Sequence, residues 1–223
     1  MHLRNVILVA LVLAVAAFAQ NPITADSPFQ IGYFANLNVS ANQYINITNT
    51  GANGAPLLGP GFGAQAGNIC VNLYAFNPDE EMISCCSCHV TPDGMKTLTV
   101  GPDILANVEN NRPGVVPSAI VVKLVATLAG TGGTGGTAAC NQSAATITTA
   151  TIVSGLVAWR TSLHANPTDA TEWEVTDSAF VPATLSAGET ASLAGRCAAI
   201  LGNATGYGVC SSCRVGALGA PRM

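Results

Sequence analysis

The sequence predicts a mainly β protein, an antiparallel β-sandwich of the immunoglobulin-like or jelly-roll-like kind, with one short C-terminal helix and a framework of disulfides. Three observations support this fold class. Short segments rich in β-branched and aromatic residues recur along the chain, their Gly, Pro and Asn connections are too short for crossover helices, and eight cysteines occur in 223 residues. A hydrophobic fraction of 49% with only 9% charged residues excludes a disordered chain.

The strand signals begin near residue 29 and continue to residue 163. Residues 43–50 alternate between apolar and polar side chains, as a half-buried strand does, and the turn cluster 51–54 follows. Residues 69–100 predict a three-stranded meander with turns at 77–80 and 91–94. We expect strands over residues 29–34, 37–40, 43–50, 69–76, 81–89, 95–100, 119–128, 146–153 and 156–163.

The hydrophobic period changes near the C-terminus and predicts one helix, over about residues 187–201. Ser186 and Glu189 fit a capping box, and apolar residues then recur at helical spacing. The Gly-rich residues 130–136 predict a loop, and the cysteine-containing tail covers residues 206–223. We expect residues 20–223 to form one domain.

Residues 1–19 predict an export signal. His2 and Arg4 give a small positive region, residues 6–17 are apolar, and Ala17-Phe18-Ala19 is a small-x-small cleavage site before Gln20. The apolar run is shorter than a membrane span, so no span is expected after cleavage. The mature protein is therefore expected to be secreted, extracellular or at the cell surface, with the periplasm as an alternative.

The charge content bears on partners and on the kind of function. The formal net charge is −4 and no run of Lys or Arg occurs, which argues against nucleic acid or an anionic membrane as partner. So little charge gives little repulsion against self-association, or against packing on other cell-surface or matrix proteins. These features favour a non-enzymatic structural or adhesive role, with no catalytic residue, metal or cofactor.

The cysteines predict disulfides, because they are even in number and follow an export signal. The candidates are Cys70, Cys85, Cys86, Cys88, Cys140, Cys197, Cys210 and Cys213.

The register of the first hairpin suggests how some of them pair. A turn centred on Pro78 and Asp79 would place Cys85 diagonally from Cys70 on one face of the sheet, which makes the two natural partners. The neighbouring Cys86 and Cys88 would point to the opposite face and need partners from elsewhere. We expect the tail cysteines Cys210 and Cys213 to be tied to them on the outer face of the meander, with Cys140 and Cys197 also available.

One alternative function is electron transfer. Cys85-Cys86-Ser87-Cys88-His89 fits C-x-x-C-H, in which Cys85 and Cys88 would bind haem c through thioethers and His89 would ligate the iron. The protein would then be an exported monohaem c-type cytochrome. Against this, the motif lies within a predicted strand, and Cys86 would be a third thiol competing for the haem.

Other site patterns are weaker. The two C-x-x-C motifs have the form of a four-thiolate zinc site or of a thiol-exchange centre, but 121 residues separate them and neither precedes a helix. Trp173 between Glu172 and Glu174 suggests a carbohydrate-binding module as a third function. No G-x-S-x-G or H-E-x-x-H pattern occurs.

The cysteine block also carries a resemblance. The pattern I-C-V-N-x-Y-x-F, then C-C-S-C-x-V-T-P-[DN]-G, and the C-terminal C-x-S-C-R resemble a family of uncharacterised secreted bacterial proteins. The likeness covers most of the mature chain from about Phe29. In that family the residue after the C-C-x-C block is usually not His, which implies that His89 is incidental. The family has no established activity, so the resemblance implies no catalytic residue.

Overall fold

The structure is a computed structural model, and it describes residues 27–37, 43–57, 66–92, 94–108, 116–129, 140, 143–165, 168–169, 172–211 and 213–215. The predicted export signal, the Gly-rich loop at 130–136 and most of the strand expected at 37–40 lie outside these residues.

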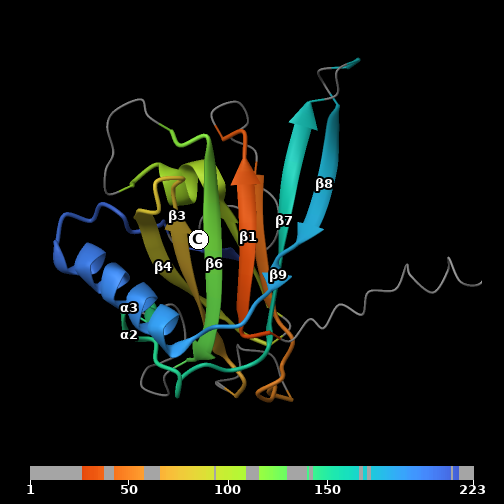
Figure 1. The fold of residues 1–223 in the computed structure, drawn as a ribbon. Coiled ribbons are helices and arrows are strands. Elements are labelled where there is room, and N and C mark those ends of the chain that lie inside the picture. Colours follow the sequence, from red (N-terminus) through yellow and green to blue (C-terminus); the bar gives the residue numbers. More distant parts are fainter. Residues whose placement is uncertain are drawn as a thin grey trace, which may run out of the picture.

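The described residues form two five-stranded antiparallel sheets, which confirms the predicted disulfide-stapled β-sandwich (Figure 1). Sheet A has, in spatial order, β4 (Met82–Val90), β3 (Ile69–Phe76), β6 (Ala119–Leu128), β1 (Phe29–Ala35) and β9 (Val181–Pro182). Sheet B has β10 (Arg214–Val215), β5 (Met95–Thr99), β2 (Gln43–Asn49), β7 (Leu156–Ala165) and β8 (Trp173–Ala179).

The main core lies between the sheets. Strand alternation directs every second side chain inward, so Ile45 and Ile47 of β2 meet Leu73 of β3 across the sandwich, and all three are fully buried. Burying an aliphatic side chain of this size contributes about 1.5–3 kcal/mol. The same core includes Phe34, Leu98, Ile120, Leu124 and Leu156.

A second core lies on the other face of sheet A, beneath the helices α2 (Ser143–Thr146) and α3 (Ala187–Gly202). Leu193 and Ile200 of α3 pack there with Tyr74 and Val125 of the sheet. Strands β3 and β6 are therefore apolar on both faces, which explains their nearly continuous hydrophobic sequences. Helix α3 confirms the predicted helix, and its N-cap Ser186 Oγ accepts a hydrogen bond from the Glu189 N–H at 3.1 Å.

The predicted meander over residues 69–100 is wrong in its third strand. Strands β3 and β4 pair as expected, but β5 pairs with β2 and β10 in sheet B. The turn after Val90 carries the chain from one sheet to the other, and Val90 and Leu98 both face the core between the sheets. A local turn signal does not distinguish a hairpin from a sheet-to-sheet crossing, because both need the same turn residues.

The strand predicted over residues 146–153 is also wrong. Residues 146–153 form the end of α2 and a turn, in which Thr151 Oγ1 donates to the Thr148 carbonyl at 2.9 Å, and only Ile152 makes a single bridge to Thr127. The β-branched residues of this segment therefore serve a side-chain-supported turn. Conversely, β8 is a regular strand that the sequence did not predict, because its residues are nearly all exposed.

No helix among the described residues combines the length and the apolar composition needed to cross a membrane.

Gly32 on β1 is required by the packing of Phe180. A Cβ at this position would lie 2.5 Å from two atoms of the Phe180 ring, which is buried beside Phe34. We expect Gly32→Ala to lower the free energy of unfolding by about 1–3 kcal/mol through overpacking. Equilibrium unfolding in urea measures this. The control is Gly195→Ala in α3, where no atom lies within 4 Å, and where alanine is expected to stabilise by about 0.5–1 kcal/mol. Equal effects of the two changes would contradict the packing argument.

Candidate functional site

The cysteines on β3 and β4, with the elements bonded to them, form the candidate site. All eight cysteines of the chain are paired in four disulfides, with Cα–Cα distances between 5.5 and 5.9 Å. The bonds are Cys70–Cys140, Cys85–Cys197, Cys86–Cys210 and Cys88–Cys213.

The alternation of β4 determines where its three cysteines point. Cys85 lies in the core beneath the helices, and it joins the sheet to Cys197 in the middle of α3. Cys86 and Cys88 lie on the opposite face and pack with the core between the sheets. One strand thus carries cross-links on both of its faces.

The tail is fixed to β4 as predicted, by Cys86–Cys210 and Cys88–Cys213, but on a different face. The expected outer face of the meander is in fact the face toward sheet B. Backbone hydrogen bonds reinforce the disulfides, because the Cys85 N–H donates to the Gly208 carbonyl at 2.8 Å and the Ser211 N–H donates to the Asp103 carbonyl at 2.8 Å. Asp103 belongs to η2 (Val100–Leu105), a single π-helical turn after β5.

The predicted Cys70–Cys85 pair is wrong, because the hairpin register differs by two residues. Cys70 lies opposite His89, and Cys85 lies opposite Tyr74. Four residues of strand separate the two cysteines, or roughly 13 Å, which no disulfide spans.

The turn of this hairpin explains the difference in register. The side chain of Asn77 accepts hydrogen bonds from the N–H groups of Asp79 and Glu81, and Glu80 adopts a left-handed φ of 65°. A β-bulge follows where Ala75 and Phe76 meet β4. The bulge and the longer turn shift β4 along β3, relative to the register predicted from a turn centred on Pro78 and Asp79.

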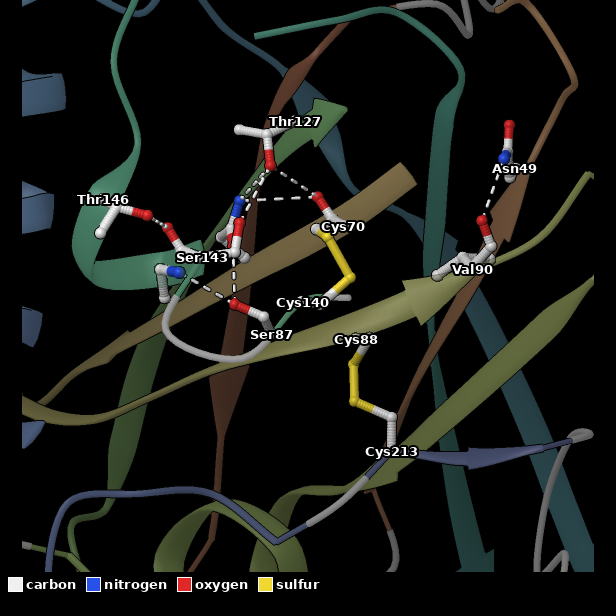
Figure 2. The surroundings of a disulfide bond; sticks show 12 residues. Asn49, Cys70, Ser87, Cys88, Val90, Thr127, Cys140, Ser143, Thr146 and Cys213 are labelled. Atoms are coloured by element: carbon white, nitrogen blue, oxygen red, sulfur yellow. Dashed lines mark hydrogen bonds between the residues drawn. A yellow bond between two sulfur atoms is a disulfide. The ribbon is translucent and has the colours of Figure 1, made fainter. Parts of the chain in front are cut away.

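A buried polar cluster, shown in Figure 2, surrounds the Cys70–Cys140 disulfide. Ser87 Oγ donates to Asn72 Oδ1 at 2.6 Å, and Asn72 Nδ2 donates to Thr127 Oγ1 at 3.1 Å. Thr127 Oγ1 lies 3.1 Å from Ser143 Oγ, and the Ala144 N–H donates to Ser87 Oγ at 2.9 Å. These bonds satisfy polar groups that are taken out of water, and they hold α2 on sheet A. Asn72 within an otherwise apolar strand is the sequence signal that could have indicated this cluster.

Tyr74 extends the attachment of α2. Its hydroxyl donates to the Ala144 carbonyl at 2.8 Å, and burial raises the pKa of this phenol far above its usual value. Tyr74 is therefore neutral at any physiological pH, and it acts as a buried donor.

A second polar row crosses the outer face of sheet B. Thr97 Oγ1 donates to Asn46 Oδ1 at 2.9 Å, Asn46 Nδ2 donates to Thr161 Oγ1 at 2.9 Å, and Thr161 Oγ1 donates to Asp177 Oδ1. The row links β5, β2, β7 and β8 by side chains as well as by backbone. No local sequence signal predicts this row, because its members lie on four separate strands.

The residues of the haem motif do not come together. Cys85 and Cys88 point to opposite faces of β4 and belong to different disulfides, so they offer no pair of thiols to one haem. His89 is only 7% exposed, its Nε2 has no hydrogen-bond partner in the described part of the chain, and it lies opposite Cys70. The geometry therefore does not fit haem c.

The other sequence-predicted residues also lie apart. Within the described ranges, no three His, Cys, Asp or Glu side chains are placed to hold a metal ion, and both C-x-x-C motifs are divided between disulfides. Trp173 is 52% exposed at the start of β8. The arrangement is thus a set of cross-links with no free thiol.

The chain matches no known family model, no curated protein and no solved structure. The resemblance of the cysteine block to secreted bacterial proteins therefore stays a prediction.

Loss of the bond between β4 and α3 should lower stability. We expect the double change Cys85→Ala with Cys197→Ala to lower the free energy of unfolding by about 2–5 kcal/mol, because it frees a loop closed over 112 residues. Guanidinium unfolding without reductant measures this. Ser84→Ala is the matched control on the same strand. Ser84 is buried and its hydroxyl has no hydrogen-bond partner among the described residues, so this change should be neutral or slightly stabilising. A double variant as stable as the wild type would contradict a stabilising role for the bond.

His89 should make the protein sensitive to acid. Burial, and to a smaller extent the Lys96 ammonium, lower the pKa of His89 below its usual 6.5. The unfolded chain then takes up a proton at a higher pH than the folded chain, so this contribution to stability is complete above about pH 6.5 and is lost as the pH falls. We expect the unfolding midpoint to fall on acidification from pH 7, and His89→Gln to flatten that dependence. The control is the same substitution at the exposed end of β7, His164→Gln, measured over the same pH range. An unchanged slope in His89→Gln would refute this assignment.

Proposed function

We propose that the protein is a non-enzymatic structural or adhesive protein, secreted or held at the cell surface, that packs against further copies or against other surface or matrix proteins. The observation that carries the proposal is the pairing of all eight cysteines, with three of the four disulfides leading from β4 to elements late in the chain.

The disulfides connect elements that sequence places far apart. They join residues 70 to 125 positions away from each other. Each bond therefore closes a large loop, which lowers the conformational entropy of the unfolded chain. A domain of this size can fold on its apolar core alone, and such cross-links add durability against proteases and drying. This supports a role outside the cell, where disulfides persist.

Several large apolar side chains are exposed on β1, β8 and β9. Tyr33 on β1, Val181 on β9, and Trp173 and Val175 on β8 are each at least 49% exposed, and β9 both follows β8 and pairs with β1. Exposed apolar side chains of this size support packing against neighbouring molecules, and on β8 the exposed carboxylates of Glu174 and Asp177 lie among them.

The export of a disulfide-bonded, haem-free protein can be tested by mass and colour. Produced in a host that matures c-type cytochromes, the exported protein should begin near Gln20, should lack a Soret band, and should be lighter than its reduced form by two hydrogens for each of four disulfides. A mass increased by one haem would overturn the proposal and favour the cytochrome.

The location and role need cells that naturally produce the protein. Antibody labelling and fractionation should find it in the medium or on the outer surface, in material that resists protease until reductant is added. Recovery in the cytoplasm with free thiols would contradict the proposed function.

A further inference from the structure

We propose that two copies of the protein associate by pairing their β8 strands antiparallel, about a two-fold axis at Thr176, so that the two copies of sheet B continue as one sheet. This inference rests on the proposed function and names one partner surface for it, which is a second copy of the same chain.

Strand β8 is an edge of sheet B with open backbone groups. It pairs with β7 on one side and, among the described residues, is the last strand of the sheet (Figure 1). All but one of its seven residues are exposed. An edge strand of this length without proline is a template for pairing with another chain.

Two hydrogen bonds fix which backbone groups are open. The Phe180 N–H donates to the Ala158 carbonyl at 3.0 Å, in register with the β7–β8 ladder, so the even-numbered residues of β8 bond to β7. The Thr50 N–H donates to the Gly155 carbonyl at 2.9 Å, so the backbone groups of the odd-numbered residues of β7 bond to β2. The even-numbered residues of β7 are then the ones that bond to β8, in agreement with the first hydrogen bond. The N–H and C=O groups of Trp173, Val175, Asp177 and Ala179 therefore point away from the protein.

The sequence of β8 is complementary to itself in one register. A two-fold axis at Thr176 places Trp173 opposite the partner's Ala179, Glu174 opposite the partner's Ser178, and Val175 opposite the partner's Asp177. All seven residues then pair, and all four open positions bond to open positions. An axis at Asp177 would oppose two aspartates, and a shift of one residue would place Glu174 opposite the partner's Asp177 and exchange the two faces of the sheet.

The strand next to β8 extends this complementarity. On the outer face, Ala179 lies beside Trp159 of β7, so the partner's Trp173 would enter the space over this small residue, next to the Trp159 indole. On the opposite face, Ser178 lies beside Arg160, whose Nε donates to Ser178 Oγ at 2.8 Å. The partner's Glu174 would then lie two strand spacings from Arg160, roughly 10 Å between backbones. Arg160 Nη1 donates to the Tyr33 carbonyl, so the other N–H groups of the guanidinium would meet the partner's carboxylate.

A pair of variants at one position tests the interface. Val175→Pro removes an N–H that points away from β7, so the β7–β8 hairpin should remain while the dimer is lost. Val175→Thr keeps that N–H and is the matched control. Sedimentation velocity of the oxidised protein from roughly 10 μM to 1 mM should show a reversible dimer for wild type and Val175→Thr and a monomer for Val175→Pro, since an interface this small gives an affinity in the micromolar range or weaker.

Hydrogen exchange and a charge reversal give independent readouts. The amides of Val175 and Asp177 should become protected as concentration rises, whereas those of Thr176 and Ser178 are protected throughout, including in Val175→Pro. Glu174→Arg should weaken the dimer roughly tenfold by opposing the partner's Arg160.

Two results would overturn the inference. One is a wild-type monomer at every concentration with fast exchange at Val175, and the other is a dimer that survives Val175→Pro. Neither result would contradict the surface location or the haem-free mass, on which the proposed function depends. Conversely, a bound haem would refute the proposed function without changing the state of association.

Discussion

The alternation of side chains along β4 is the constraint on which the rest of the molecule depends. Because Cys85 and Cys86 are adjacent in an extended strand, their side chains must point to opposite faces of sheet A. One bond therefore leads to α3 and the other to the tail. A helix layer and a tail segment are thus fixed to the same strand. Strand β4, with nine residues, is therefore cross-linked to α3 on one face of sheet A and to the tail on the face toward sheet B.

The two faces of sheet A are stabilised differently. Toward sheet B the core is mainly aliphatic and aromatic, and a few buried hydrogen bonds cross it, such as Gln30 Nε2 to the Leu156 carbonyl at 2.6 Å and Asn49 Nδ2 to the Val90 carbonyl at 3.1 Å. Toward the helices, Asn72, Ser87 and Thr127 form a hydrogen-bonded cluster under α2. Loss of any one of these side chains would leave a buried polar group without its partner. α2 has only four residues and no helical stability of its own, so the polar cluster and the Cys70–Cys140 bond hold it in place. Specific positioning on this face thus comes from polar groups, and cohesion on the other comes from burial.

The sequence predicted the elements whose signal is local. β3 and β6 begin and end at the predicted residues, and α3 ends within one residue of its prediction, because continuous apolar runs and a capping box depend on near neighbours. The partner of β5 could not be predicted, since pairing with a strand distant in sequence leaves no trace in the strand itself. The Cys70 partner was wrong because a bulge and the Asn77 turn shift the register. β8 was missed because an exposed edge strand lacks the apolar alternation that identifies a buried one.

The order of the cysteines along the chain has a consequence for biogenesis. Four thiols, at Cys70, Cys85, Cys86 and Cys88, are made first during synthesis, and each of their partners follows 70 to 125 residues later. Until Cys140 follows, 52 residues after Cys88, these thiols have only one another as partners, so a fast oxidant would trap them in non-native pairs. Any bonds formed early among these thiols must be reshuffled before the native set is complete, because β4 cannot be fully oxidised in its native pairing until Cys213 has been made.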